Sequence, residues 1–256
     1  MILTIDVGNT HTLFGIFEKD NLTLTARMAT DRQKTADEYA IAIRNLLSLH
    51  TLSATDISGA IISSVVPQLS PAFRRAVKML CDCKVFIVGP GVKTGLHIGI
   101  DNPAQLGADL VCVSVAAQHK YPLPSIVFDL GTATTISALD KNGTMLGGSI
   151  LTGVNTALNA LAQSTAQLPH ISLEGQVPTI GSNTIDSMRS GAVLGAAAMI
   201  DGMIARYREV LGENAFVIAT GGLAPIILPH CKQTIQLDEN LLLEGLYLIY
   251  QRNCAQ

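Results

Sequence analysis

The sequence predicts an α/β protein built from two similar halves. Short, wholly apolar runs that suit strands covered on both faces alternate along the chain with longer amphipathic patterns that suit helices. Two stretches also share one pattern, "ILTIDVGNTHTLFGIFEKD" from Ile2 and "SIVFDLGTATTISALDKNG" from Ser125. A strand-and-turn pattern that recurs after about half of a 256-residue chain indicates a gene duplication and two similar lobes facing a cleft.

Each half opens with strand, tight turn, strand, turn and strand. The returns "FEKDN" and "LDKNG" are rich in turn residues, so the strands they join are expected to pair antiparallel. The predicted strands span residues 2–5, 13–17, 22–27, 59–63, 85–88, 125–128, 134–138, 145–150 and 215–219. The predicted helices span residues 35–50, 106–119, 155–165, 183–211 and 239–251. Thr35, followed three positions later by Glu38, gives the first helix a capping-box signature.

The boundary between the halves is expected in the loop around residues 119–124, just before the second copy. No Pro-rich or Gly-rich linker marks it in the sequence. We therefore expect an N-terminal lobe of residues 1–120 with the first copy and a C-terminal lobe of residues 121–256 with the second.

Composition narrows the classes of function. A hydrophobic fraction of 48% against 14% charged residues supplies a sizeable core and argues against a disordered chain. A net charge of −3, no Trp and only five Tyr and six Phe disfavour a nucleic-acid partner. No apolar run reaches the roughly 18 residues of a membrane span and no secretion signal is recognised, so no membrane partner is expected. Five scattered Cys indicate reduced thiols and a cytoplasmic location.

The polar residues of the repeated stretch suit a phosphate site. Asp6 ends a buried strand, where a carboxylate is costly unless it is paired, hydrogen-bonded or near a cation. Gly8 permits a close backbone approach, and Asn9, Thr10 and Thr12 supply donors. Backbone N–H groups in such a turn can cradle phosphate oxygens while the Asp holds hydrated Mg²⁺. For one copy alone, a hairpin turn with Asp and Asn as turn formers remains the alternative.

A third element strengthens the nucleotide interpretation. "VIATGGLAPII" is a strand followed by Thr220-Gly221-Gly222, where bare backbone lets a flat ring or ribose lie close. Two phosphate turns and this Gly pair together resemble the actin, Hsp70 and sugar-kinase superfamily. That resemblance implies duplicated ribonuclease-H-like lobes, with mixed sheets flanked by helices and ATP in the cleft between them. A P-loop is disfavoured because Val92 separates Gly91 from Lys93.

Asp109 is the candidate general base. It lies in "DNPAQLGAD", in the first turn of a predicted helix, where the helix dipole alone favours a carboxylate. The functional alternative is that it takes the proton of a substrate hydroxyl as a γ-phosphate arrives.

Seven motifs in order resemble the type III pantothenate kinases. They are "DVGNT", "SSVVPQ", "VKTGL", "DNPAQLGAD", "FDLGTATT", "GGSILTG" and "ATGG", and they span nearly the whole chain. The resemblance implies ATP-dependent phosphorylation of pantothenate, the first step of coenzyme A synthesis. It also implies Mg²⁺, a monovalent cation such as K⁺ or NH₄⁺, and a homodimer.

The resemblance also implies a set of site residues. The first phosphate loop would comprise Asp6, Val7, Gly8, Asn9, Thr10, His11, Thr12 and Leu13, with Asp6 acting indirectly on the metal-bound phosphates. Gly107, Ala108 and Asp109 would line the pantothenate pocket, with Asp109 as the base. Asp129 would hold the monovalent cation, Thr132 would contact ATP, and Thr184 would contact pantothenate. For Thr184 the alternative is the N-cap of the long helix.

Two positions depart from the family pattern. Leu110 stands where Arg usually follows the catalytic Asp, and Ile100 stands where Tyr is common. Leu offers no fork of donors to substrate oxygens. The rival interpretations are therefore another small-molecule kinase or a polyphosphate phosphatase of the same superfamily, and a nucleotide-binding regulator with impaired turnover.

Overall fold

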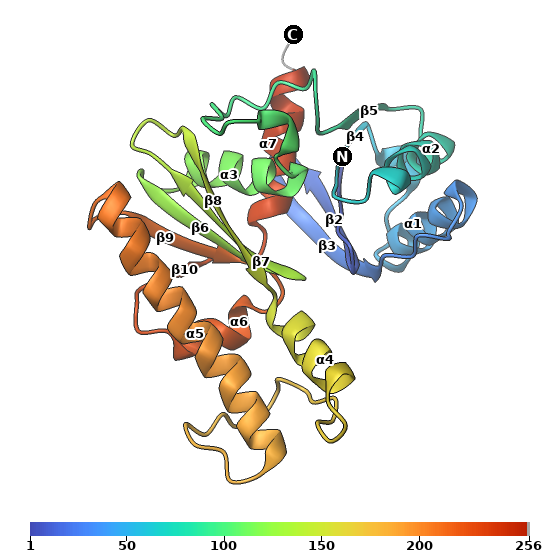
Figure 1. The fold of residues 1–256 in the computed structure, drawn as a ribbon. Coiled ribbons are helices and arrows are strands. Elements are labelled where there is room, and N and C mark those ends of the chain that lie inside the picture. The colour runs from blue at the N-terminus through green and yellow to red at the C-terminus, as the bar shows by residue number, and fades with distance from the viewer. Residues whose placement is uncertain (255–256) are drawn as a thin grey trace. The chain divides into compact units, whose positions relative to one another are not determined.

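The computed structural model describes residues 1–254. The chain forms two compact units (Figure 1). The first comprises Met1–Leu96, Asp101–Ala116 and the chain from Asn240 onward, and the second comprises His97–Ile100 and Ala117–Glu239. The two copies of the repeated stretch therefore fall in different units.

The first unit is built on a mixed five-stranded sheet. Its strands, in spatial order β3-β2-β1-β4-β5, span Asn21–Ala29, His11–Glu18, Ile2–Val7, Gly59–Ser64 and Lys84–Ile87. β1 pairs antiparallel with β2 and parallel with β4, which places Asp6 directly beside Ser63.

The second unit repeats this arrangement. Its strands, in spatial order β8-β7-β6-β9-β10, span Met145–Thr152, Ala133–Leu139, Ser125–Leu130, Phe216–Thr220 and Gln236–Leu237. β6 pairs antiparallel with β7 and parallel with β9, which places Asp129 beside Thr220. The predicted duplication of mixed sheets flanked by helices is thus confirmed.

Helices flank both sheets. The α-helices α1 to α7 span Ala36–Leu49, Ser70–Leu80, Ala108–Lys120, Val154–Ser164, Thr184–Leu211, Ala224–Ile227 and Leu241–Cys254. Short 3₁₀ turns, η1 to η4, span Ala54–Asp56, Pro67–Leu69, Pro103–Gln105 and Leu228–His230. The predicted helix at 106–119 starts instead at Ala108, because η3 occupies the chain just before it.

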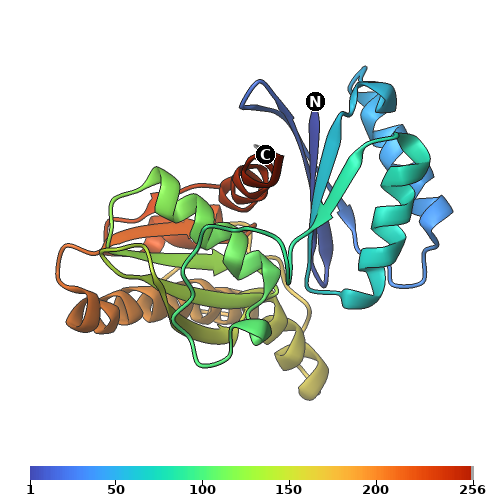
Figure 2. The ribbon, with the colours of Figure 1, turned by 90° about the horizontal axis from the view of Figure 1, so that it is seen from above.

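The first sheet is covered on both faces by different helices (Figure 2). Alternate residues of β1, such as Leu3 and Val7, join the core formed with α1 and α2. The intervening Thr4 and Asp6 point to the opposite face, since successive side chains of a strand alternate. α7 packs there against β1, β2 and β4. The sequence predicted that residues 121–256 form one lobe, but α7 groups with the first unit.

Two glycines allow α7 to approach so closely. A Cβ on Gly59 of β4 would collide with the Tyr250 hydroxyl, and a Cβ on Gly245 would collide with the Cys112 carbonyl. The glycine at position 59 lets Tyr250 of α7 pack on the sheet, and the glycine at position 245 lets α3 pack against α7.

Sequence reasoning missed α2, α6 and β10. α2 carries Phe73, Ala76 and Val77 at helical spacing, all buried. Pro71 lies in its first turn, where a missing N–H costs no helical hydrogen bond. Here a proline marks the start of a helix and not a loop.

Among residues 1–254, α5 is the one helix long and apolar enough by itself to cross a membrane. One of its faces packs in the core of the second unit through Val193, Ile200 and Ile204. Near its middle, the Asp201 carboxylate accepts hydrogen bonds from the backbone N–H groups of Lys232 and Gln233 at 2.9–3.0 Å. These contacts are those of a helix covering a sheet.

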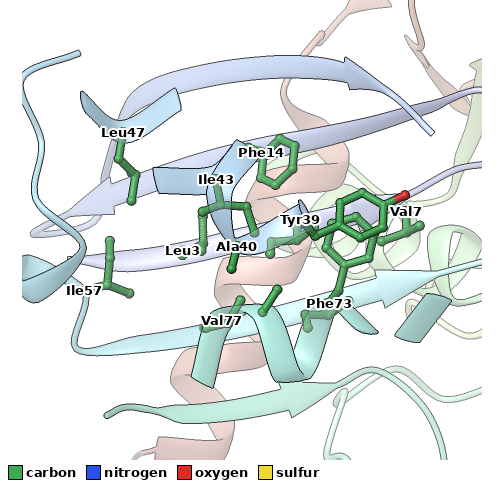
Figure 3. Packing of buried hydrophobic residues seen from close by; sticks show 14 of the residues in the cluster. Leu3, Val7, Phe14, Tyr39, Ala40, Ile43, Leu47, Ile57, Phe73 and Val77 are labelled. Atoms are coloured by element: carbon green, nitrogen blue, oxygen red, sulfur yellow. The ribbon is translucent and has the colours of Figure 1, made fainter. Parts of the chain in front are cut away.

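Phe73 anchors the contact of α1 and α2 (Figure 3). Its ring is fully buried, 4.1 Å from the Tyr39 ring centroid and 6.5 Å from that of Phe14. We expect Phe73→Ala to lower the free energy of unfolding by about 3–5 kcal/mol, because it leaves a cavity. Urea denaturation followed by circular dichroism measures this. Met79→Ala, on the exposed side of the same helix, is the control and should change stability by less than about 1 kcal/mol. Equal effects of the two substitutions would contradict this view of the core.

Candidate active site

The first turn, residues 8–11 between β1 and β2, requires its glycine. The Gly8 N–H donates to the His11 carbonyl at 3.0 Å. A Cβ on Gly8 would lie 2.8 Å from that carbonyl oxygen, closer than real side chains allow. Asn9, Thr10 and His11 are exposed, so this turn presents an amide, a hydroxyl and an imidazole to solvent.

The flanking residues of the predicted phosphate loop have supporting positions. Val7 and Thr12 are fully buried, and Leu13 is half-buried in β2. The Thr12 hydroxyl lies 2.9 Å from the Thr30 hydroxyl. Any side-chain contact with a ligand therefore belongs to the turn itself, while these three residues hold it in place.

The first unit brings Asp6, Ser63, Asp109 and Cys112 together. Asp6 is 7% exposed and lies beside Ser63 on the face of the sheet that α7 covers. Burial raises the pKa of the Cys112 thiol well above its usual range, and the charges of Asp6 and Asp109 raise it further. One buried thiol thus lies close to both carboxylates.

Asp109 lies in the first turn of α3, as predicted. Its Oδ1 accepts from the Leu110 N–H at 2.8 Å. Burial raises the pKa of the carboxyl group, and hydrogen bonds from backbone N–H groups partly offset this. A Cβ on Gly107 would collide with Asp109 Oδ1, so the glycine leaves room for the carboxylate. A raised pKa makes a carboxylate a better proton acceptor near neutral pH.

The second turn, residues 131–133 between β6 and β7, is built similarly. The Gly131 N–H donates to the Ala133 carbonyl at 3.1 Å. Thr132 is exposed, and its carbonyl accepts from the Thr156 hydroxyl at 2.7 Å. Gly221 has φ +93°, and a Cβ there would meet Asp129 Oδ1 at 2.5 Å. The carboxylate of Asp129 therefore lies directly against the backbone of the predicted adenosine loop.

Thr184 is the first residue of α5, but it is not the N-cap. Asn183 takes that place, and its Oδ1 accepts from the Asp186 N–H at 3.0 Å. The capping interpretation of Thr184 is wrong, since the side chain one position earlier satisfies that N–H. Thr184 is exposed and lines a surface pocket of about 450 Å³ with Gly181 and Ser187. Its side chain remains available for a ligand.

No group of three or more His, Cys, Asp or Glu within residues 1–254 is arranged to hold a metal ion.

Sequence reasoning named Asp6 and Asp109 but missed Ser63 and Cys112. Ser63 lies in the quoted motif "SSVVPQ", and a parallel register between the first and fourth strands would have placed it beside Asp6. Cys112 is three positions after Asp109, on the same side of the helix. Ser63 was recognisable only once the strand order was known.

The comparisons with known proteins agree with one another. A family model described as type III pantothenate kinase matches residues 2–206. Relatives named type III pantothenate kinase, from Exiguobacterium sp. strain AT1b and Geotalea uraniireducens, are 43% and 40% identical over 253 residues, which is 99% of each chain.

Solved structures of lower identity share the fold. The activator of 2-hydroxyisocaproyl-CoA dehydratase from Clostridium difficile, with bound ADPNP, has a TM-score of 0.58 at 14% identity, covering 100% of this chain and 96% of its own. The ROK hexokinase from Thermus thermophilus has a TM-score of 0.54 at 13% identity, covering 98% and 99%.

The raised pKa of Asp109 has a consequence for stability. A carboxyl whose pKa is higher in the folded than in the unfolded chain lowers stability at pH values above its folded pKa. Below its unfolded pKa it is neutral in both states and the cost disappears. Asp109→Asn should therefore raise the free energy of unfolding at pH 8, and this gain should shrink as the pH falls toward 4. Urea titrations at both pH values measure it. Asp82→Asn, at an exposed position, is the control, and a gain for Asp109→Asn independent of pH would contradict the argument.

Proposed function

We propose that this chain, which belongs to the type III pantothenate kinase family, transfers the γ-phosphoryl group of ATP to pantothenate, the first step of coenzyme A biosynthesis. The family assignment covers nearly the full length of the chain and of its relatives. The structural observation that supports it is the pair of carboxylates, Asp6 and Asp109, that share the buried surroundings of Cys112.

Phosphoryl transfer to a hydroxyl requires a general base and groups that stabilise the negative charge on the phosphates. Asp109 takes the proton of the pantothenate hydroxyl as its oxygen bonds to the γ-phosphorus and ADP leaves. Gly107 and Ala108 form the wall beside this carboxylate. The first turn, residues 8–11, holds phosphate oxygens through N–H and hydroxyl donors.

Asp6 has the surroundings that a metal-linked carboxylate needs. It is almost completely buried and comes directly before the exposed turn. We propose that it orients water molecules of a Mg²⁺ ion whose other ligands are the phosphates of ATP. When bound, Mg²⁺ neutralises charge on the β- and γ-phosphates.

Three residues of the second unit are also proposed to bind ligands. Thr132, exposed in the second turn, contacts ATP. We propose that Asp129 holds a K⁺ or NH₄⁺ ion, and its position against the bare backbone of Gly221 supports this. The side chain of Thr184 contacts pantothenate. Leu110 provides no guanidinium for substrate oxygens, so binding of pantothenate depends on the other residues.

We also propose that the protein acts as a homodimer in the cytoplasm. A Cβ on Gly191, Gly195 or Gly202 of α5 would meet no atom within 4 Å, so this face of the helix is open. Ile185 on the same helix is 47% exposed and Ile150 on β8 is 77% exposed. Small and apolar residues that are open in one chain suit close packing against a second copy.

The base assignment is tested with Asp109→Asn. We expect kcat to fall about 10²- to 10⁴-fold, because the amide accepts no proton, while ADP binding stays nearly unchanged. A coupled ADP-release assay with and without pantothenate measures turnover, and calorimetry measures binding. Asp82→Asn should retain full activity. Full activity in Asp109→Asn would refute the base assignment. If the wild-type chain released ADP at the same rate with and without pantothenate, the proposed acceptor would be refuted.

The cation assignment is tested with Asp129→Ala. We expect the activation by K⁺ to be lost, because the carboxylate no longer balances the charge of the ion. Initial rates across a KCl series, with NaCl holding the ionic strength constant, measure this, and NH₄Cl should substitute for KCl in the wild type only. Glu174→Ala, at an exposed position of the same unit, should keep the wild-type K⁺ response. An unchanged K⁺ response in Asp129→Ala would remove the role of that residue.

A further inference from the structure

A guanidinium group lies against the first turn. The Arg32 Nη2 atom donates to Asn9 Oδ1 at 2.8 Å, although the two residues come from different connections of the first unit. We propose that Arg32 is a phosphate-binding residue of the nucleotide site, which grips the polyphosphate chain together with Asn9. This inference rests on the proposed function, because that function places the nucleotide phosphates at the first turn.

The segment that carries Arg32 is fixed to the turn and to the core. The Thr30 N–H donates to the Thr10 carbonyl at 2.9 Å. The Tyr39 hydroxyl donates to the Asp31 carbonyl at 2.6 Å, and the Tyr39 ring is fully buried. Arg32 therefore directly follows two anchored residues, Thr30 and Asp31, which keep its backbone near the turn.

The charge of Arg32 is available for a ligand. Within residues 1–254 Arg32 makes no ion pair, and its side chain is exposed. Two carboxylates nearby in sequence bind other groups: Asp31 Oδ1 accepts from the Gln33 N–H at 2.9 Å, and Glu38 completes the capping box with Thr35. One of the five guanidinium N–H donors is occupied by Asn9, and the rest can form the two parallel hydrogen bonds that phosphate favours.

Arg32 also sets the orientation of Asn9. Because the guanidinium takes the oxygen end of the amide, the NH₂ end of Asn9 faces away from it and is left as a donor. An anion at the first turn thus meets the guanidinium and the amide donor together. At the second turn, the neutral hydroxyl of Thr156 donates to the Thr132 carbonyl. Arg32 gives the first turn a positive charge that its counterpart does not receive from this support.

The test separates a phosphate contact from a merely structural tether. We expect Arg32→Ala to weaken ADP binding about 10- to 100-fold while adenosine binding changes less than about 2-fold, because adenosine carries no phosphate. The KM for ATP should rise with the weaker ADP binding, and the KM for pantothenate should stay constant. Arg32→Lys, which keeps the charge without the fork, should recover part of the loss. Arg44→Ala, at an exposed position of α1, is the matched control.

The outcomes distinguish this inference from the proposed function. Unchanged ADP binding in an Arg32→Ala enzyme that still phosphorylates pantothenate would overturn the role of Arg32 alone. Equal loss of ADP and adenosine binding would overturn it too, since that pattern means a collapsed turn. Selective loss of ADP binding in a chain that does not phosphorylate pantothenate would support Arg32 and overturn the proposed function. A wild-type chain that binds no ADP would contradict both.

Discussion

The chemistry of the first unit depends on the parallel register of β1 and β4. That register places Asp6 beside Ser63 on the face covered by α7, so a carboxylate is buried at the end of a central strand. Burying a charge is costly unless donors or a cation compensate for it. The adjoining turn, residues 8–11, supplies donors and an open approach for metal and phosphate. Under the proposed function, the same register that creates this cost places the carboxylate where bound Mg²⁺ and phosphate would offset it.

The two sheets share the same strand register, but the equivalent carboxylates, Asp6 and Asp129, have different surroundings. Asp129 has the place of Asp6 in the second sheet, and Thr220 has the place of Ser63. Asp6 lies on the face of the sheet that α7 covers and its charge acts on the Cys112 thiol, whereas Asp129 lies against the backbone of Gly221. A carboxylate among protein side chains and one against bare backbone meet different ligands. This contrast supports assigning phosphate-bound metal to the first and a monovalent cation to the second.

The sequence predicted what depends on local pattern. The paired Asp-x-Gly turns, the Thr35 capping box and the apolar strands all follow from neighbouring residues, and the structure confirms them. What it did not predict depends on contacts between distant segments. The place of α7 in the first unit follows from Tyr250 packing over Gly59, and the place of Ser63 beside Asp6 follows from the strand order. The alternative role considered for Thr184, the cap of α5, belongs to Asn183 one residue earlier, and adjacent Asn and Thr are both good caps.

The departure at Leu110 has an electrostatic consequence as well as a loss of contact. A guanidinium beside Asp109 would favour the charged carboxylate and lower its pKa. With Leu110 at that place, burial has the largest effect on this carboxyl and raises its pKa. Cys112 adds no negative charge nearby, because its own pKa is raised so far that the thiol stays protonated. A carboxylate with a raised pKa holds a proton more readily, so under the proposed function the chain lacks one donor to substrate oxygens and has a stronger proton acceptor at Asp109.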